Sequence, residues 1–203
     1  MTRPLLVTGF APFGGEAINP SWEAVRRLEG RSIAGHPVIA RQLPVVYHVA
    51  IHELEAAIAE VNPLVALSVG QMGGRGEISI ERLGRNVDDH EAPDAAGVRR
   101  KGEVIFAGEP ETLAPTFPVD DIVAALQRAG IPAAVSDDAG GYVCNHLLYG
   151  ACRLAARRPD APIVGFIHVP FAPEQTGRPC LPIPTVAAAL EIALTTILAK
   201  AAR

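Results

Sequence analysis

The stretch "IPAAVSDDAGGYVCNHLLYGACRLAARRPDAPIVGFIHVPF" occupies residues 131–171 and reads as strand, turn, helix and strand. Residues 131–137 and 161–171 are short apolar runs, which are typical of strands covered on both faces. Residues 143–157 have helical apolar spacing and directly follow a Gly-Gly turn. Strands that alternate with helices in this way predict an α/β fold.

The same alternation extends over most of the chain. Helix 21–30 begins at a Ser cap, and helix 49–62 stops before a proline. The pattern predicts an α/β sandwich with a largely parallel or mixed sheet. The further predicted strands are residues 4–10, 37–45, 64–70 and 78–84, and the further predicted helices are 21–30, 49–62, 119–130 and 185–203.

One segment departs from the alternation. Residues 88–118 are rich in Asp, Gly and Pro and have no clear period, so they are the best candidate for a mobile flap. We find no internal repeat, and residues 1–203 are expected to form a single domain with this flap as its one irregular part.

Composition excludes several functional classes. The chain has 203 residues, 49% hydrophobic and 20% charged, with a net charge of −4, which is typical of a soluble globular protein without a nucleic-acid footprint. The basic run at 98–102 is interpreted as a solvated loop. No uninterrupted apolar run long enough for a membrane span or secretory signal is present, so we expect a cytoplasmic protein that does not bind membranes. Three cysteines without CxxC spacing argue against a disulfide framework.

Cys144 is placed in the predicted first turn of helix 143–157. Unpaired backbone N–H groups and the helix dipole favour negative charge at that end of a helix. A cysteine there ionises more readily than an ordinary thiol, whose pKa is ~8.5. Its position indicates a nucleophile, and the alternative is a buried structural cysteine.

A cysteine nucleophile needs a base. His168 ends the predicted strand 161–171 at the carboxyl edge of the sheet, where ligands bind in such folds. It is therefore either that base or a structural strand histidine. His146 lies two residues after Cys144 and so points to roughly the opposite face of the helix, which indicates a structural or helix-surface residue.

Two acidic features also need an interpretation. Glu81 falls on the opposite strand face from Ile78 and Ile80, and it either orients a catalytic histidine or faces solvent. The run "DDHE" at 88–91 is interpreted as a solvated loop, because four consecutive side chains cannot converge on one ion. The sequence predicts no metal site.

Glycine-rich loops follow two of the predicted strands. "GFAPFGG" at 9–15 and "GQMGGRG" at 70–76 match neither the dinucleotide fingerprint nor a P-loop. They fit close backbone approach to an uncharged ligand better, and so disfavour a nucleoside or sugar-phosphate enzyme.

Four sequence blocks together resemble the pyroglutamyl peptidase type I family, the pyrrolidone-carboxylate peptidases. The blocks follow in order along nearly the whole chain: "GFAPFGGEAINPS" (9–21), "VGQMGGRGEISIER" (69–82), "SDDAGGYVCNHLLYG" (136–150) and "GFIHVPFAPEQ" (165–175). The resemblance implies a cofactor-free cysteine omega-peptidase that removes N-terminal pyroglutamate from peptides through an acyl-thioester. It also implies a three-layer α/β/α sandwich, similar to the phosphorylase/hydrolase fold, and a homotetramer.

The resemblance further implies roles for individual residues. Motif matching assigns a catalytic triad to Cys144, His168 and Glu81. The apolar pocket for the lactam ring maps onto Phe10, Phe13 and Val143, with Gln71 approaching the lactam.

The chain departs from the family pattern after the matched glutamate. The family pattern resembles "ERxAxNxxDARIPD" where this chain reads "ERLGRNVDDHEAPD", so Glu91 replaces an arginine and Ala92 an isoleucine. A carboxylate there would repel developing negative charge, and Ala92 would remove apolar wall. The alternative is therefore a family member of low or altered activity that binds pyroglutamyl peptides or free pyroglutamate. Arg85 is a candidate substitute cation, and Gly141 with Tyr142 suggests a looser or altered entrance.

Overall fold

A mixed sheet of seven strands forms the centre of the structure, which is a computed structural model that describes residues 2–175 and 179–202. The strand order is β10-β5-β11-β4-β1-β3-β2. The strands are β1 (Leu5–Phe10), β2 (Ser32–Ile33), β3 (His36–Leu43), β4 (Val65–Gln71), β5 (Ile78–Glu81), β10 (Ala133–Ser136) and β11 (Ile163–Val169).

Strand direction changes once within the main body of the sheet. Strands β3, β1, β4 and β11 are parallel to one another. Strand β5 runs antiparallel to β11, and β10 pairs with β5 in parallel. The six predicted strands are confirmed, with ends that differ by a few residues. The prediction missed β2, because two residues are too short to show a period; it pairs antiparallel with β3 at the sheet edge.

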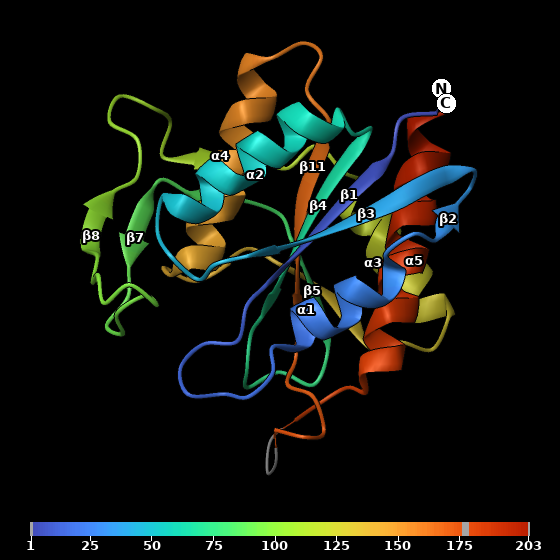
Figure 1. Cartoon of the computed structure of the whole chain (residues 1–203), viewed down its shortest axis with the longest axis horizontal. Coiled ribbons are helices and arrows are strands. Elements are labelled where there is room, and N and C mark those ends of the chain that lie inside the picture. Colours follow the sequence, from blue (N-terminus) through green and yellow to red (C-terminus); the bar gives the residue numbers. More distant parts are fainter. Residues whose placement is uncertain (1, 176–178, 203) are drawn as a thin grey trace.

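Helices cover both faces of the sheet. Helices α2 and α4 lie on one face, and α1, α3 and α5 lie on the other (Figure 1). This arrangement confirms the three-layer α/β/α sandwich. Each face has its own apolar core, because the parallel strands are apolar on both sides. The helices are α1 (Pro20–Val25), α2 (Val49–Val61), α3 (Val119–Arg128), α4 (Val143–Arg157) and α5 (Ile183–Ala201).

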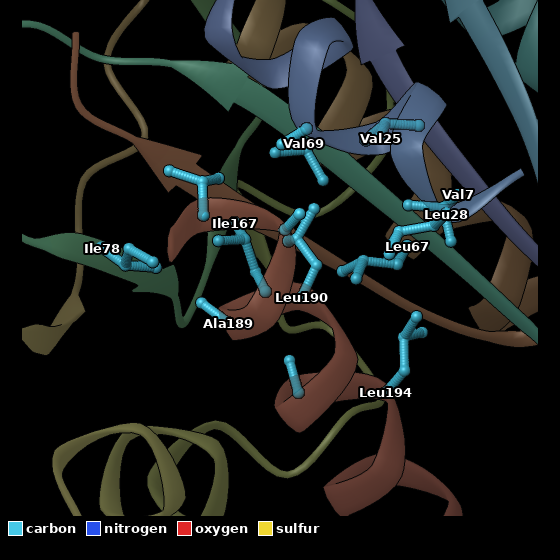
Figure 2. Packing of buried hydrophobic residues seen from close by; sticks show 14 of the residues in the cluster. Val7, Val25, Leu28, Leu67, Val69, Ile78, Ile167, Ala189, Leu190 and Leu194 are labelled. Atoms are coloured by element: carbon cyan, nitrogen blue, oxygen red, sulfur yellow. The ribbon is translucent and has the colours of Figure 1, made fainter. Parts of the chain in front are cut away.

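Helix α5 is long and apolar enough, by length and composition alone, to cross a membrane. Half of its apolar stretch is buried inside the fold. Leu190 and Leu194 of α5 pack toward the β4 residues Leu67 and Val69 and the β11 residue Ile167 (Figure 2). Core packing therefore accounts for the hydrophobicity of this helix. The last residue of the predicted helix 185–203 lies outside the described residues.

Helix α1 begins differently from the prediction. Asn19, not Ser21, is the N-cap, and its side chain accepts a hydrogen bond from the Ser21 N–H at 3.1 Å. The Ser21 hydroxyl instead accepts from the N–H of Phe10 at 3.0 Å. A Cβ on Gly9 would lie 2.8 Å from the backbone of Trp22, so glycine is needed for α1 to approach β1 this closely.

The predicted flap, residues 88–118, contains regular structure. Strand β7 (Val87–Asp89) pairs with β8 (Lys101–Val104) outside the main sheet, and β6 (Gly84–Arg85) pairs with β9 (Thr112–Leu113) (Figure 1). Strands of two to four residues are too short to produce a recognisable period. The mobility of this segment stays a prediction.

Candidate active site

Cys144 is the second residue of α4 and lies at the mouth of a cavity. Tyr142 is the N-cap of the helix and follows a glycine turn in which Gly140 has φ 79°, a conformation that favours glycine. The first-turn N–H groups of α4 therefore surround the cysteine. The sulfur rests against β4, because a Cβ added to Gly70 would lie 2.8 Å from Cys144 Sγ.

Two buried side chains from neighbouring strands form a hydrogen-bonded pair beside this cysteine. His168 lies on β11 opposite Ser79 of β5, and Glu81 is two residues further along β5 on the same face. His168 Nδ1 is 2.8 Å from Glu81 Oε1, and both side chains are buried. Among the described residues, Glu81 Oε2 has no hydrogen-bond partner. Because Nδ1 of His168 contacts Glu81, Nε2 is the ring nitrogen that can interact with Cys144.

The imidazole of His168 is held in its protonated form. Burial by itself would lower the pKa of His168. The interactions of the imidazole with Cys144 and then with Glu81 outweigh burial, and they raise the His168 pKa from 6.5 to about 9. An imidazolium with a carboxylate on one side and the cysteine sulfur on the other matches the arrangement that activates a cysteine nucleophile.

The residues predicted for a lactam pocket divide into two groups. Phe13 and Gln71 line a cavity of about 520 Å³ together with Cys144 and His168. Phe10 and Val143 do not line this cavity but are buried in the core on the same face of the sheet.

Gln71 is oriented by a residue that sequence reasoning did not single out. The Gln175 Nε2 donates to Gln71 Oε1 at 3.1 Å, while Gln175 Oε1 accepts from the Ala172 N–H at 3.0 Å. The bond to Gln175 occupies the acceptor of the Gln71 amide. Gln71 lines the cavity, and the NH₂ group is the hydrogen-bond donor of its amide.

Most of a second wall of the cavity was also missed, since only Ala92 was expected at the lactam pocket. Residues 90–95, here called the wall segment, contribute His90, Ala92, Pro93, Asp94 and Ala95 to the lining. The His90 ring packs against Tyr142, with ring centroids 4.4 Å apart, and the Tyr142 hydroxyl donates to the Pro93 carbonyl at 2.9 Å. An aromatic residue two positions before the cysteine was the one local signal for this wall.

The two predictions of solvated loops are only partly correct, because residues 87–89 and 101–104 pair as strands and Asp88 is buried, whereas Glu91, Arg99 and Lys101 are exposed. Asp88 and His146 are both fully buried and are joined by hydrogen bonds from His146 Nδ1 at 2.9 and 3.0 Å. Arg100 Nε donates to Asp88 Oδ2 at 2.6 Å. Of the two roles predicted for His146, structural or helix-surface, the structure confirms the structural one. Across residues 2–175 and 179–202, no group of three or more His, Cys, Asp or Glu side chains could hold a metal ion.

The departures from the family pattern lie mostly away from the cysteine. The Glu91 side chain is 80% exposed, pairs with Lys101 and does not line the cavity. Arg85 pairs with Asp138 at 2.8 Å and does not line it either. Neither residue lies where the sequence comparison suggested a charge would act.

The entrance is close-packed at Gly141, contrary to the expectation of a looser entrance. A Cβ on Gly141 would lie 2.3 Å from the Asp89 carbonyl oxygen, and the Asp89 N–H donates to the Gly141 carbonyl at 2.9 Å. Glycine at 141 therefore allows the chain just before the wall segment to pack directly on the turn before the cysteine.

Comparison with known proteins identifies relatives over nearly the full length. A family model described as pyroglutamyl peptidase matches residues 3–200. A pyrrolidone-carboxylate peptidase of Enterobacter sp. (strain 638) is 46% identical over 200 residues, which cover 97% of this chain and 93% of the relative. A pyrrolidone-carboxylate peptidase 1 of Ralstonia nicotianae is 44% identical over 200 residues, with coverage of 97% and 93%.

Solved structures agree with these relatives. Pyroglutamyl peptidase I from Bacillus amyloliquefaciens superimposes with a TM-score of 0.94 at 40% identity, covering 97% of this chain and 95% of that chain. Pyrrolidone carboxyl peptidase from Pyrococcus furiosus superimposes with a TM-score of 0.93 at 36% identity, covering 97% and 99%. Since the family match spans the whole fold and includes the cysteine, histidine and glutamate that meet at the cavity, the chain belongs to the pyroglutamyl peptidase family.

Proposed function

We propose that this chain is a cysteine omega-peptidase that releases N-terminal pyroglutamate from peptides. Family membership supports the activity, and one geometric observation supports the residues: His168, whose Nδ1 lies 2.8 Å from Glu81 Oε1, lines the same cavity as Cys144. In this proposal Cys144 is the nucleophile, His168 the general acid and base, and Glu81 the group that orients the imidazole.

The chemistry proceeds in two stages. The Cys144 sulfur attacks the carbonyl carbon that follows the lactam ring, and the first-turn N–H groups of α4 stabilise the oxyanion. The His168 imidazolium gives its proton to the departing amine as the C–N bond breaks, leaving pyroglutamate bound to sulfur as a thioester. Neutral His168 then takes a proton from water, which attacks the thioester and releases pyroglutamate, and the proton remains on His168.

The cavity suits the uncharged lactam ring. Pyroglutamate lacks the ammonium group that ordinary aminopeptidases hold, so an apolar pocket with few polar groups fits it. Phe13 supplies an apolar wall, and the NH₂ of Gln71 is a donor that suits the lactam carbonyl. We assign Phe10 and Val143 a supporting role, since both are buried in the core on the face of the sheet that carries α4.

The direct test is hydrolysis of a chromogenic pyroglutamyl amide by purified protein under reducing conditions. A free-amine aminoacyl amide with the same leaving group is the control. The proposal requires thiol-dependent turnover of the pyroglutamyl substrate alone. Equal turnover of the free-amine substrate, or no turnover by folded protein, would contradict it.

Gly70→Ala is expected to lower kcat/KM by about 10²-fold, the cost of a misplacement of roughly 1 Å in a reacting group. The new methyl would lie 2.8 Å from Cys144 Sγ and 2.7 Å from the Phe166 ring, so the sulfur must move. Steady-state kinetics and the rate of alkylation by iodoacetamide measure the effect. Gly76→Ala is the control, because a Cβ there has no contact closer than 3.6 Å. Wild-type kinetics for Gly70→Ala would contradict the placement of the sulfur.

The alternative of a weakly active binding protein rested on Glu91. Because this side chain is exposed and paired with Lys101, its charge is screened by solvent. We therefore expect Glu91→Arg and Glu91→Ala to leave kcat/KM within about threefold of wild type, as is usual for exposed ion pairs. Kinetics with the pyroglutamyl amide measure this. A rise of an order of magnitude or more in Glu91→Arg would revive the alternative.

We also propose that the enzyme acts in the cytoplasm as a homotetramer. In the described part of the chain Cys144, Cys152 and Cys180 are all free, which suits a reducing compartment. The tetramer rests on family resemblance. Sedimentation equilibrium tests the assembly, and a monomer at micromolar concentration would contradict it.

A further inference from the structure

A buried charged cluster lies apart from Cys144, His168 and Glu81. The Asp88 carboxylate accepts hydrogen bonds from His146 and from Arg100, and both Asp88 and His146 are fully buried. Burying a carboxylate is costly unless its partners are well placed, and well-packed apolar side chains often give equal or better stability. Stability alone is therefore a weak explanation for this cluster.

The hydrogen bonds of His146 define one tautomer. The backbone N–H of His48 donates to His146 Nε2 at 3.0 Å, so Nε2 is an acceptor. The ring proton is then on Nδ1, which donates to Asp88. The neutral imidazole thus joins the backbone at His48, just before α2, to the carboxylate on β7.

The backbone at His48 is in a strained conformation. His48 has φ 59° and ψ −41°, and the Val49 N–H donates to the Tyr47 carbonyl at 2.6 Å, which closes a three-residue turn. A non-glycine residue keeps such a conformation only where its surroundings restrain it. The bond to His146 and the edge-on contact of the two imidazole rings, with centroids 4.6 Å apart, supply that restraint.

This turn is tied directly to the wall segment. The Tyr47 N–H donates to Asp94 Oδ2 at 3.0 Å, and the Ala95 N–H donates to the Val45 carbonyl at 2.9 Å. The other Asp94 oxygen accepts from the N–H groups of Ala96 and Val98 at 2.9 and 2.8 Å. The wall segment is therefore held at Asp94 through the turn.

The other end of the wall segment is held through the same histidine. Asp88, two residues before His90, binds the His146 imidazole, and His146 lies on α4 two residues after Cys144. His146 does not line the cavity. One side chain on the nucleophile's helix therefore restrains both ends of the opposite cavity wall.

We propose that the Asp88–His146 pair positions the wall segment, residues 90–95, relative to Cys144 and thereby sets the affinity of the cavity for substrate. The inference rests on the proposed peptidase function. His146 acts as a positioning residue in this scheme, because it contacts Asp88 and the turn at His48 but does not line the cavity.

The test compares His146→Leu, which removes both hydrogen bonds, with His146→Asn, whose amide can still donate to Asp88. Cys152→Ala is the matched control, since Cys152 is a buried residue on the same helix that does not line the cavity. Kinetics with a pyroglutamyl amide separate kcat from KM. Hydrogen exchange at the Ala96 and Val98 amides, which bond to Asp94, reports the wall segment without any substrate.

We expect His146→Leu to raise KM by about tenfold, equivalent to about 1.4 kcal/mol of binding, with kcat changed by less than about threefold. Exchange at the two amides should quicken by about tenfold or more. His146→Asn should show the same changes to a smaller extent, and it keeps the test decisive if the leucine variant does not fold. Cys152→Ala should keep the wild-type KM and exchange rates.

Three results would overturn the proposal: unchanged KM and exchange in a folded His146 variant, a fall in kcat at constant KM, or equal changes in Cys152→Ala. Failure of the peptidase function is distinguishable from these. If the wild type hydrolyses no pyroglutamyl substrate, the proposed function fails, whereas the exchange rates still decide whether His146 holds the wall segment.

Discussion

Replacement of Cys144 by alanine is expected to lower kcat/KM for a pyroglutamyl amide by about 10⁴-fold or more, as for other nucleophiles that work with a partner base. No other thiol can replace it, because Cys144 is the one cysteine in the cavity lining. The fold should survive, since the side chain is only partly buried and alanine suits the interior of α4. Steady-state kinetics combined with circular dichroism measure both expectations.

The matched control is Cys152→Ala on the same helix. Burial raises the pKa of the Cys152 thiol to about 12, so it stays protonated and unreactive, and it does not line the cavity. This variant should keep its activity. Turnover that persists in Cys144→Ala, or vanishes in Cys152→Ala while the protein remains folded, would exclude Cys144 as the nucleophile.

Glu81→Gln is expected to lower kcat/KM by about 10³- to 10⁴-fold, close to the loss when the carboxylate of a serine protease triad becomes an amide. The change removes the negative partner of His168 Nδ1 at 2.8 Å and leaves the shape nearly unchanged. The imidazolium is then less stable, and the glutamine amide can select the wrong tautomer. Kinetics together with imidazole titration by NMR measure the effect.

The pH profile gives an independent readout of the same contact. The raised His168 pKa means that the imidazolium, which protonates the leaving amine, is present below about pH 9 and is lost as the pH rises through that value. Activity should therefore fall on the alkaline side near pH 9. In Glu81→Gln this fall should move to lower pH, since a stabilising negative charge is gone. An alkaline limb at the same pH in both proteins would show that Glu81 does not support the imidazolium.

Much of the fold was predictable because its signals are local. The continuous apolar runs of β1, β4 and β11 identify strands buried on both faces, and the glycine turn before Cys144 identifies the start of α4. Such signals depend on residues within one or two turns of each other. The predicted elements therefore agreed closely with the structure.

Burial of polar residues could not be predicted in the same way. Asp88 and Arg100 lie in strongly polar stretches, and local composition indicates solvent for both. The structure buries Asp88 and most of Arg100, because the two stretches pair with each other and with His146. Glu91 shows the opposite case, since a position that sequence comparison placed near the site proved to be exposed.

The sequence by itself determined the alternation of strands and helices and the motifs that carry Cys144, His168 and Glu81, because both depend on neighbouring residues. Only the tertiary structure decided that β5 runs antiparallel to β11, which brings Glu81 to His168 across 87 positions of sequence. It alone also decided that His90 and residues 93–95 join Ala92 in the second cavity wall. Strand order and loop placement arise from hydrogen bonds and packing between distant segments, and no local pattern encodes which distant partner each segment will meet.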